Sequence, residues 1–254
     1  MLKHLLIFFI IVSAATAQPT DSKLLKEILE NLIPVFSNIF SEPDQYKLQI
    51  IYTQVNRDRN NVPELATHTY RLKPREYFYP ASTIKIPIAV LAMEKLNSIE
   101  NIDRDTPLNI LTEMPGLEGI LEDKTSRTGL PSIAHYIHKL FVVSDNDASN
   151  RLFEFLRRDY LNQRLWDLGY TETRIRQRLG ISLSEKQNRY TSSFRFFHDG
   201  SIIYEQPSQK AEIDLNVNYN DYLIGKAHMK SGKRVEQPFD FSKKNFMNLM
   251  EQHR

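Results

Sequence analysis

The stretch YPASTIKIP, residues 79–87, decides how this sequence is interpreted. From Ser82 to about Leu96 the chain is strongly apolar, which predicts a buried helix. Ser82 and Lys85 are three residues apart, so they share one face of that helix with about 5–6 Å between their Cβ atoms. A lysine amine at this spacing can reach the serine oxygen.

Ser82 is therefore a candidate nucleophile and Lys85 its candidate base. A serine hydroxyl is a weak nucleophile unless a base lies within hydrogen-bond reach. Unpaired backbone N–H groups at a helix start can also stabilise an oxyanion. The lysine must be neutral to accept a proton, and burial among apolar neighbours would lower its pKa. In the alternative interpretation, Ser82 only caps the helix and Lys85 is a solvated lysine.

A second motif, Ser144-Asp145-Asn146, forms a polar break within the stretch FVVSDNDASNRLFEFL at residues 141–156. It lies between two predicted helices, 131–143 and 147–156, where side chains can point into a cleft. The Ser144 hydroxyl can relay a proton to a leaving nitrogen, and the Asn146 amide can hold a substrate carbonyl and the lysine. Helix capping alone is the alternative, because all three residue types are favoured at N-caps.

In this order the motifs resemble those of serine β-lactamases and penicillin-binding proteins, whose signature combines S-x-x-K, S-D-N and K-T-G. The resemblance runs from about residue 22 to residue 178, with TETRIRQRL at 171–179 similar to the family's approach to its Ω-loop. It implies that Ser82 is acylated, that Lys85 is the base, that Ser144 is a proton shuttle and that Asn146 binds substrate. The implied reaction is hydrolysis of β-lactam amides through an acyl-enzyme, without a cofactor, in a protein of antibiotic resistance.

The Ω-loop departs from that pattern. Family members that hydrolyse β-lactams efficiently carry a glutamate within E-x-x-L-N, which activates the deacylating water. Here residues 182–188 offer only Glu185, three positions before Asn188 rather than four. Glu185 is either that base or a solvated loop residue. Acylation is better supported than turnover, which leaves open a D,D-peptidase or transpeptidase-like enzyme, or a catalytically inactive binding protein.

A third motif is ambiguous. Lys230-Ser231-Gly232 fits K-[ST]-G, but residues 221–238 also look like a hairpin, and glycine tolerates the positive φ of a turn. The family places this motif on an edge strand that is followed by more strands and a long helix. Few residues follow Gly232, so we expect the chain to be truncated at its C-terminus.

The order of predicted elements indicates an α+β fold, with an antiparallel sheet packed against a helical subdomain. Two strands come early, a block of helices follows, and strands return. Beyond the helices named above, we expect helices at 22–40, 160–168 and 243–253, strands at 46–55 and 67–72, and a loop from 103 to 130.

The N-terminus is typical of a secretory signal. An apolar run from Leu5 to Val12 follows a short basic start and precedes Ala15-Thr16-Ala17, an A-x-A cleavage pattern. We expect cleavage after Ala17, a single mature domain over residues 18–254 and a periplasmic or secreted location. A retained anchor is the alternative, although the run is far shorter than the roughly 20 residues that span a bilayer.

Charge and composition limit the classes of partner and of chemistry that we expect. The chain has 33 basic and 31 acidic residues without a clustered basic run, which argues against a nucleic-acid partner. The absence of cysteine excludes a thiol nucleophile. His135 and His138 have a spacing that could ligate a metal, but ordinary histidines are the better interpretation. We expect a monomer that acts on a small β-lactam or a cell-wall peptide.

Overall fold

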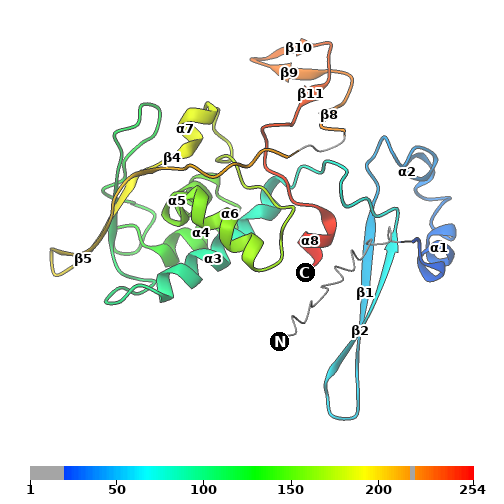
Figure 1. Cartoon of the computed structure of the whole chain (residues 1–254), viewed down its shortest axis with the longest axis horizontal. Helices are drawn as coiled ribbons and strands as arrows, with labels where there is room; N and C mark the ends of the chain where they lie inside the picture. The colour runs from blue at the N-terminus through cyan, green and yellow to red at the C-terminus, as the bar shows by residue number, and fades with distance from the viewer. Residues whose placement is uncertain (1–19, 218–220) are drawn as a thin grey trace, which may run out of the picture. The chain divides into compact units, whose positions relative to one another are not determined.

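The structure is a computed structural model that describes residues 20–217 and 221–254. The predicted signal peptide and its cleavage site lie outside the described residues. Contacts between residues divide the chain into two compact units, residues 1–73 and residues 74–254 (Figure 1). The single domain expected over residues 18–254 stays a prediction.

In the first unit, the long opening helix predicted for residues 22–40 is wrong. The segment forms two short helices, α1 (Lys23–Glu30) and α2 (Ser37–Ser41). The Ser22 hydroxyl caps α1 by accepting a hydrogen bond from the Leu25 N–H at 3.1 Å. Pro34 explains the break, because proline has no N–H for a helical hydrogen bond and disfavours helical backbone in the residue before it.

The same unit contains the predicted antiparallel pair of strands. Strands β1 (Ile50–Arg57) and β2 (Pro63–Tyr70) run antiparallel, with a register from Ile50 opposite Tyr70 to Arg57 opposite Pro63. The pairing is confirmed, although both strands begin and end a few residues away from the expected positions.

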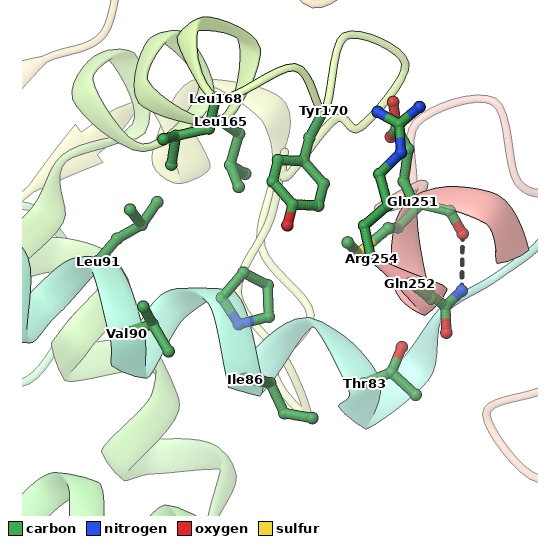
Figure 2. A pocket seen from close by; sticks show the side chains of 12 residues that line it. Thr83, Ile86, Val90, Leu91, Leu165, Leu168, Tyr170, Glu251, Gln252 and Arg254 are labelled. Carbon is green, nitrogen blue, oxygen red and sulfur yellow. Dashed lines mark hydrogen bonds between the residues drawn. The ribbon is translucent and has the colours of Figure 1, made fainter. Parts of the chain in front are cut away.

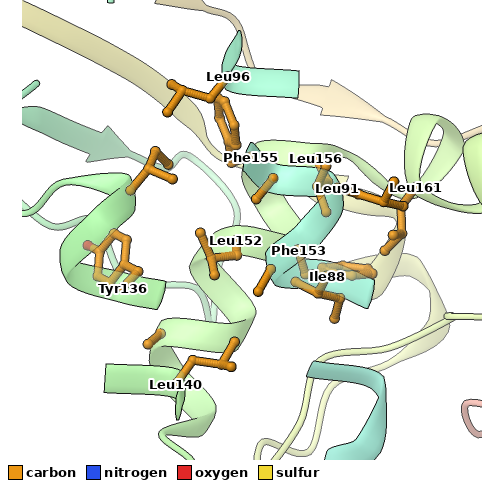
Figure 3. Packing of buried hydrophobic residues seen from close by; sticks show 14 of the residues in the cluster. Ile88, Leu91, Leu96, Tyr136, Leu140, Leu152, Phe153, Phe155, Leu156 and Leu161 are labelled. Carbon is orange, nitrogen blue, oxygen red and sulfur yellow. The ribbon is translucent and has the colours of Figure 1, made fainter. Parts of the chain in front are cut away.

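Four helices build the core of the second unit: α3 (Lys85–Asn97), α4 (Ile133–Val143), α5 (Asn146–Leu156) and α6 (Arg158–Asp167). The last three are confirmed to within two residues of their predicted bounds, and α3 begins three residues later than expected. Their apolar faces meet in one cluster of buried side chains (Figure 3). This cluster includes Ile88, Leu91, Leu96, Tyr136, Leu140, Leu152, Phe153, Phe155, Leu156 and Leu161.

An antiparallel sheet of three strands packs against these helices. Its order is β3 (Leu108–Leu111), β5 (Ser193–His198) and β6 (Ser201–Gln206). Phe194 and Phe196 of β5 are fully buried, with ring centroids 5.7 and 5.9 Å from the Phe155 ring of α5. The α+β fold class is confirmed. The loop expected from 103 to 130 is wrong at residues 108–111, because these residues pair with β5.

The predicted helix over residues 243–253 is also wrong for most of its length. Phe246 exchanges two backbone hydrogen bonds of 2.9 Å with Arg174, and this bridge prevents helical pairing of the same groups. Only α8 (Leu249–His253) is helical, and Asn248 caps it. Among the helices that the structure describes, none combines the length and apolar character that crossing a bilayer requires.

The remaining elements of the second unit are short. They are α7 (Glu185–Arg189), β4 (Tyr190–Thr191), β7 (Gln209–Lys210), β8 (Leu223–Ile224), β9 (His228–Lys230), β10 (Lys233–Val235) and β11 (Phe239–Asp240).

Candidate active site

Ser82 lies in a 3₁₀ turn, η1 (Ala81–Ile84), which leads directly into α3. Its side chain is exposed, and its N–H has no carbonyl partner among the backbone contacts of the described residues. The preceding Ala81 has a φ of +46°, a left-handed conformation that is uncommon outside glycine. An exposed hydroxyl and an N–H without a backbone partner among the described residues therefore lie together at the start of the helix.

The amine of Lys85 is held by one tripeptide. Nζ donates to the main-chain carbonyl of Ser144, to Ser144 Oγ at 3.0 Å and to Asn146 Oδ1 at 2.8 Å. The lysine is only 3% exposed. The structure thus brings together Lys85, Ser144 and Asn146, three of the four predicted site residues. The Ser82 hydroxyl is one helical turn away and is not among the acceptors that the described residues offer this amine.

The surroundings of Lys85 alter its acidity. Burial lowers the pKa of the Lys85 ammonium below its ordinary value, because removal from water disfavours the charged form. The nearby Asp145 carboxylate opposes this effect and is the weaker of the two causes. A lower pKa raises the fraction of neutral amine near neutral pH, and the neutral form is the one that can accept a proton.

The turn between α4 and α5 aims these groups at the lysine. Ser144 ends α4 with a φ of +53°, and this left-handed residue reverses the chain. Asp145 then caps α5, because its Oδ1 accepts a hydrogen bond from the Ala148 N–H at 2.9 Å. The reversal turns both the carbonyl and the hydroxyl of Ser144 toward Lys85. Ser144 and Asn146 are exposed, so the amine lies beneath an open polar surface.

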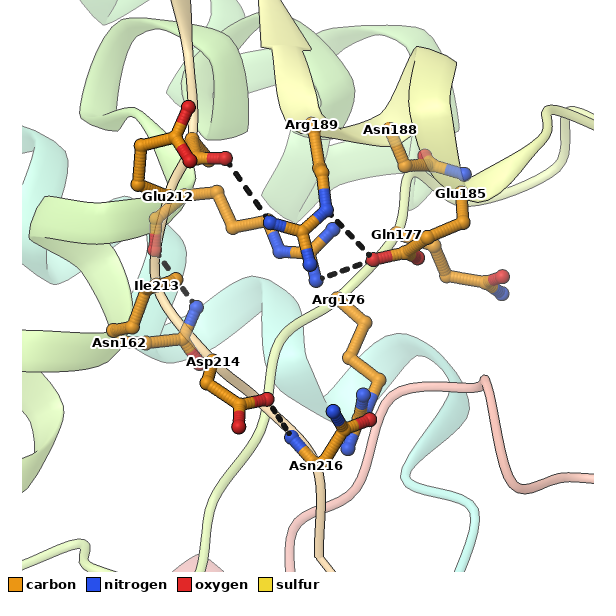
Figure 4. Close-up of polar contacts among 12 residues, drawn as sticks. Asn162, Arg176, Gln177, Glu185, Asn188, Arg189, Glu212, Ile213, Asp214 and Asn216 are labelled. Carbon is orange, nitrogen blue, oxygen red and sulfur yellow. Dashed lines mark hydrogen bonds and ion pairs between the residues drawn. The ribbon is translucent and has the colours of Figure 1, made fainter.

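Glu185, the candidate deacylation base, is engaged elsewhere. It is the first residue of α7, and its Oε1 accepts from Arg158 Nη2 at 2.8 Å and lies 3.3 Å from Arg189 Nε (Figure 4). Asn188 holds the same loop, since its Oδ1 accepts from the Arg178 N–H at 3.0 Å. Through these contacts Glu185 belongs to an ion-pair cluster that holds the loop, and its side chain is 43% exposed.

Lys230-Ser231-Gly232 forms a hairpin turn. Lys230 at the end of β9 pairs with Lys233 at the start of β10. Ser231 and Gly232 make the connection with φ angles of +50° and +75°. Two central residues with positive φ are typical of the type I′ turn that joins antiparallel strands. The hairpin interpretation of this segment is confirmed, and the structure gives no support to its alternative as the third family motif.

The two histidines of α4 occupy different settings. His135 Nε2 lies 3.1 Å from both Asp123 Oδ2 and Thr125 Oγ1, whereas His138 is exposed. Within residues 20–217 and 221–254, no three His, Cys, Asp or Glu side chains gather in a way that could hold a metal ion.

Two residues beside the site were not singled out from the sequence. Asn150 on α5 exchanges two hydrogen bonds with the backbone of Leu179, and this pairing brings Gly180 against the Asn146 side chain. A signal for Asn150 existed, because its spacing of four positions from Asn146 places the two amides on one face of a helix. Gly180 had no comparable local signal.

An apolar cavity of about 350 Å³ lies on a neighbouring face of α3 (Figure 2). Ile86 and Val90 line it from α3, opposite Leu165, Leu168 and Tyr170. Thr83, the residue after the candidate nucleophile, lines the cavity. Neither Ser82 nor Lys85 lines it.

Comparison with known families found a match. A family model described as the Beta-lactamase enzyme family matches residues 36–211, which include Ser82, Lys85, Ser144 and Asn146. The match covers more than half of the chain, so the chain belongs to this family and has a β-lactamase-like serine hydrolase fold. No curated protein resembles the chain closely enough to count as a match.

Proposed function

We propose that the chain is a serine hydrolase that opens β-lactam amides through an acyl-enzyme on Ser82. The observation that carries this proposal is the buried amine of Lys85, which the 144–146 turn holds one helical turn from an exposed serine hydroxyl. Membership of the β-lactamase family supports the same class of reaction.

In the proposed acylation, neutral Lys85 removes the proton from Ser82 Oγ as this oxygen bonds to the lactam carbonyl carbon. The Ser82 N–H donates to the developing oxyanion. The ring C–N bond then breaks, and the nitrogen takes a proton from the Ser144 hydroxyl, which regains one from the Lys85 ammonium. Asn146 keeps Oδ1 on Lys85 and offers its Nδ2 to a substrate carbonyl.

Deacylation requires a water molecule that attacks the ester carbonyl and a base that accepts its proton. The ion pairs of Glu185 with Arg158 and Arg189 leave that carboxylate poorly suited to this role. We therefore propose slow release of the drug. Slow release favours a second candidate function, a D,D-peptidase or transpeptidase-like enzyme that uses the same acylating residues on cell-wall peptides.

Incubation with a tagged penicillin tests the proposal. We expect a single adduct that mass spectrometry maps to Ser82 and that is lost in Ser82→Ala. An equal adduct in that variant, or none in the folded wild-type protein, would refute it. Nitrocefin and a D-alanyl-D-alanine peptide then separate the two candidates. A burst without sustained nitrocefin hydrolysis, together with release of D-alanine, supports the peptidase.

We further propose that the protein is exported and acts as a monomer in the periplasm or outside the cell. The basic start, the apolar run and the Ala15-Thr16-Ala17 pattern support export. N-terminal sequencing of the exported protein should give Gln18 as its first residue. Retention of residues 1–17 on a membrane-bound protein would contradict the proposal.

A further inference from the structure

Gly180 packs directly on the side chain of a candidate active-site residue. Its φ is +71°, and a methyl group added at its Cα would lie 2.6 Å from Asn146 Nδ2 and 3.3 Å from Asn146 Cβ and Cγ. Contacts below 3 Å are too short for nonbonded carbon and nitrogen, so one side must move. The Asn146 amide is not free to do so, because its Oδ1 accepts from Lys85 Nζ at 2.8 Å.

The backbone around Gly180 is fastened to the helix that carries Asn146. Asn150 donates from Nδ2 to the Leu179 carbonyl at 2.9 Å, and its Oδ1 accepts from the Leu179 N–H at 2.7 Å. One turn further along α5, Glu154 accepts from Arg178 Nε at 3.1 Å. Asn150, Glu154 and Arg178 are all buried.

These contacts follow one stripe of α5. Asn146, Asn150 and Glu154 are spaced by four residues, so they lie on the same face of the helix. Opposite them come Gly180, Leu179 and Arg178 in turn. The two buried pairings fix the distance between the segment and the helix, and therefore no residue with a side chain fits at position 180 without displacing Asn146.

We propose that Gly180 is a positioning residue, whose missing side chain lets Asn146 keep its hydrogen bond to the Lys85 amine. The proposal rests on the proposed function of Ser82, Lys85 and Asn146. Gly180 acts through Asn146 and not on the substrate. A larger residue at position 180 displaces the Asn146 side-chain amide. The Lys85 amine then loses Asn146 Oδ1 as an acceptor, and Asn146 Nδ2 no longer points toward the position of the substrate carbonyl.

The chain offers a matched control. Gly200, in the turn between β5 and β6, has a φ of +77°, and a methyl group added there would meet nothing within 4 Å. Gly180→Ala and Gly200→Ala therefore share the strain of alanine in a left-handed conformation. Only Gly180→Ala adds the collision with Asn146.

The first experiment is a double-mutant cycle on unfolding, which does not depend on activity. We expect Gly180→Ala to lower the equilibrium constant for folding at least about tenfold more than Gly200→Ala does. In the Asn146→Ala background, which removes the amide, this excess should fall below about threefold. An equal cost of Gly180→Ala in both backgrounds would overturn the proposal. If Gly180→Ala alone does not fold, recovery of folding in Asn146→Ala/Gly180→Ala supports it, and no recovery overturns it.

The second experiment follows acylation by a fluorescent penicillin as a function of pH. Loss of the Asn146 acceptor removes support from the ammonium form of Lys85, so the profile of Gly180→Ala should shift about one unit toward lower pH, with a rate about 10–100-fold lower. Gly200→Ala should keep the wild-type profile. A lower rate without a shift would mean that Gly180 has only a structural role, and would overturn the proposal. Absence of acylation in the wild-type protein would overturn the proposed function instead, while the unfolding cycle still decides about Gly180.

Discussion

The two ends of helix α3 each carry a lysine whose pKa is lowered by burial, yet only one end resembles an active site. At the start, Lys85 faces a hydroxyl, an amide and a carbonyl from an exposed turn. In the last turn, Lys95 donates to the Phe155 carbonyl and to Gln206 Oε1, with its Nζ 4.6 Å from the Phe155 ring centroid.

The difference teaches that a perturbed amine is not by itself a catalytic group. Burial and, to a smaller extent, the charge of Arg157 together lower the pKa of Lys95 to about 7. The described surroundings of Lys95 nevertheless contain aromatic rings and carbonyl-type acceptors, with no hydroxyl bonded to the amine. Lys85, in contrast, follows the exposed Ser82 by one helical turn, and its Nζ lies 3.0 Å from Ser144 Oγ.

The largest expected effect separates the two lysines directly. Lys85→Gln should slow the acylation of Ser82 by about 10³-fold, because the general base is lost. Lys95→Met, compared under conditions in which circular dichroism shows both variants folded, should change the rate less than about threefold. Stopped-flow measurements with a fluorescent penicillin provide the rates. If the acylation rate fell equally in both variants, Lys85 would have no catalytic role that distinguishes it from Lys95.

A smaller effect is expected from the serines beside each lysine. Ser144→Ala removes the proposed proton relay while the Ser144 carbonyl still holds Lys85, so acylation should fall about 10²-fold. Ser98 is the matched control, since its hydroxyl donates to the Lys95 carbonyl at 2.7 Å and it is exposed. Ser98→Ala should keep the wild-type rate. A wild-type rate in Ser144→Ala would argue against the relay.

The third prediction concerns stability and pH at the Lys95 end. The folded protein has a Lys95 pKa of about 7, below the unfolded value of 10.5, so the unfolded chain binds more protons between these limits. The free energy of unfolding should therefore rise from pH 7 to pH 9, by about 2 kcal/mol from this group. Urea unfolding should show that this increment is missing in Lys95→Met. The same increment in both proteins would contradict the assignment.

The smallest effect is expected at Glu185, which contacts neither lysine of α3. Glu185→Gln weakens the ion pairs with Arg158 and Arg189, but the lifetime of the acyl-enzyme should change less than about twofold. Mass spectrometry after dilution from excess penicillin measures this lifetime. A lifetime ten times longer in Glu185→Gln would identify Glu185 as the deacylation base after all.

The contacts of Lys85 with the 144–146 turn could be expected from the sequence because they depend on local geometry, whereas a hydrogen bond between Ser82 and Lys85 is not among the contacts of the described residues. Helical spacing relates Ser82 to Lys85, and the polar break between two helical patterns locates the 144–146 turn. The positive φ of Ser144 could not be predicted from the sequence, whereas the turn between the two helices could.

The rest of the neighbourhood depends on pairings between distant residues, which no local pattern specifies. Strand 108–111 has an ordinary loop-like sequence around it and becomes a strand only because β5 lies beside it. The pairing of Phe246 with Arg174 replaces a predicted helix for the same reason. The contact between Gly180 and the Asn146 side chain likewise joins residues that are more than thirty positions apart in the sequence.

The pH dependence of Ser82 acylation in the wild-type protein, Lys85→Gln and Lys95→Met tests the central claim most directly. If the Lys85 amine activates Ser82, the wild-type rate rises through a single ionisation below pH 10.5, Lys95→Met keeps that rise, and Lys85→Gln loses it. A rise that survives in Lys85→Gln, or that disappears in folded Lys95→Met, would contradict the account.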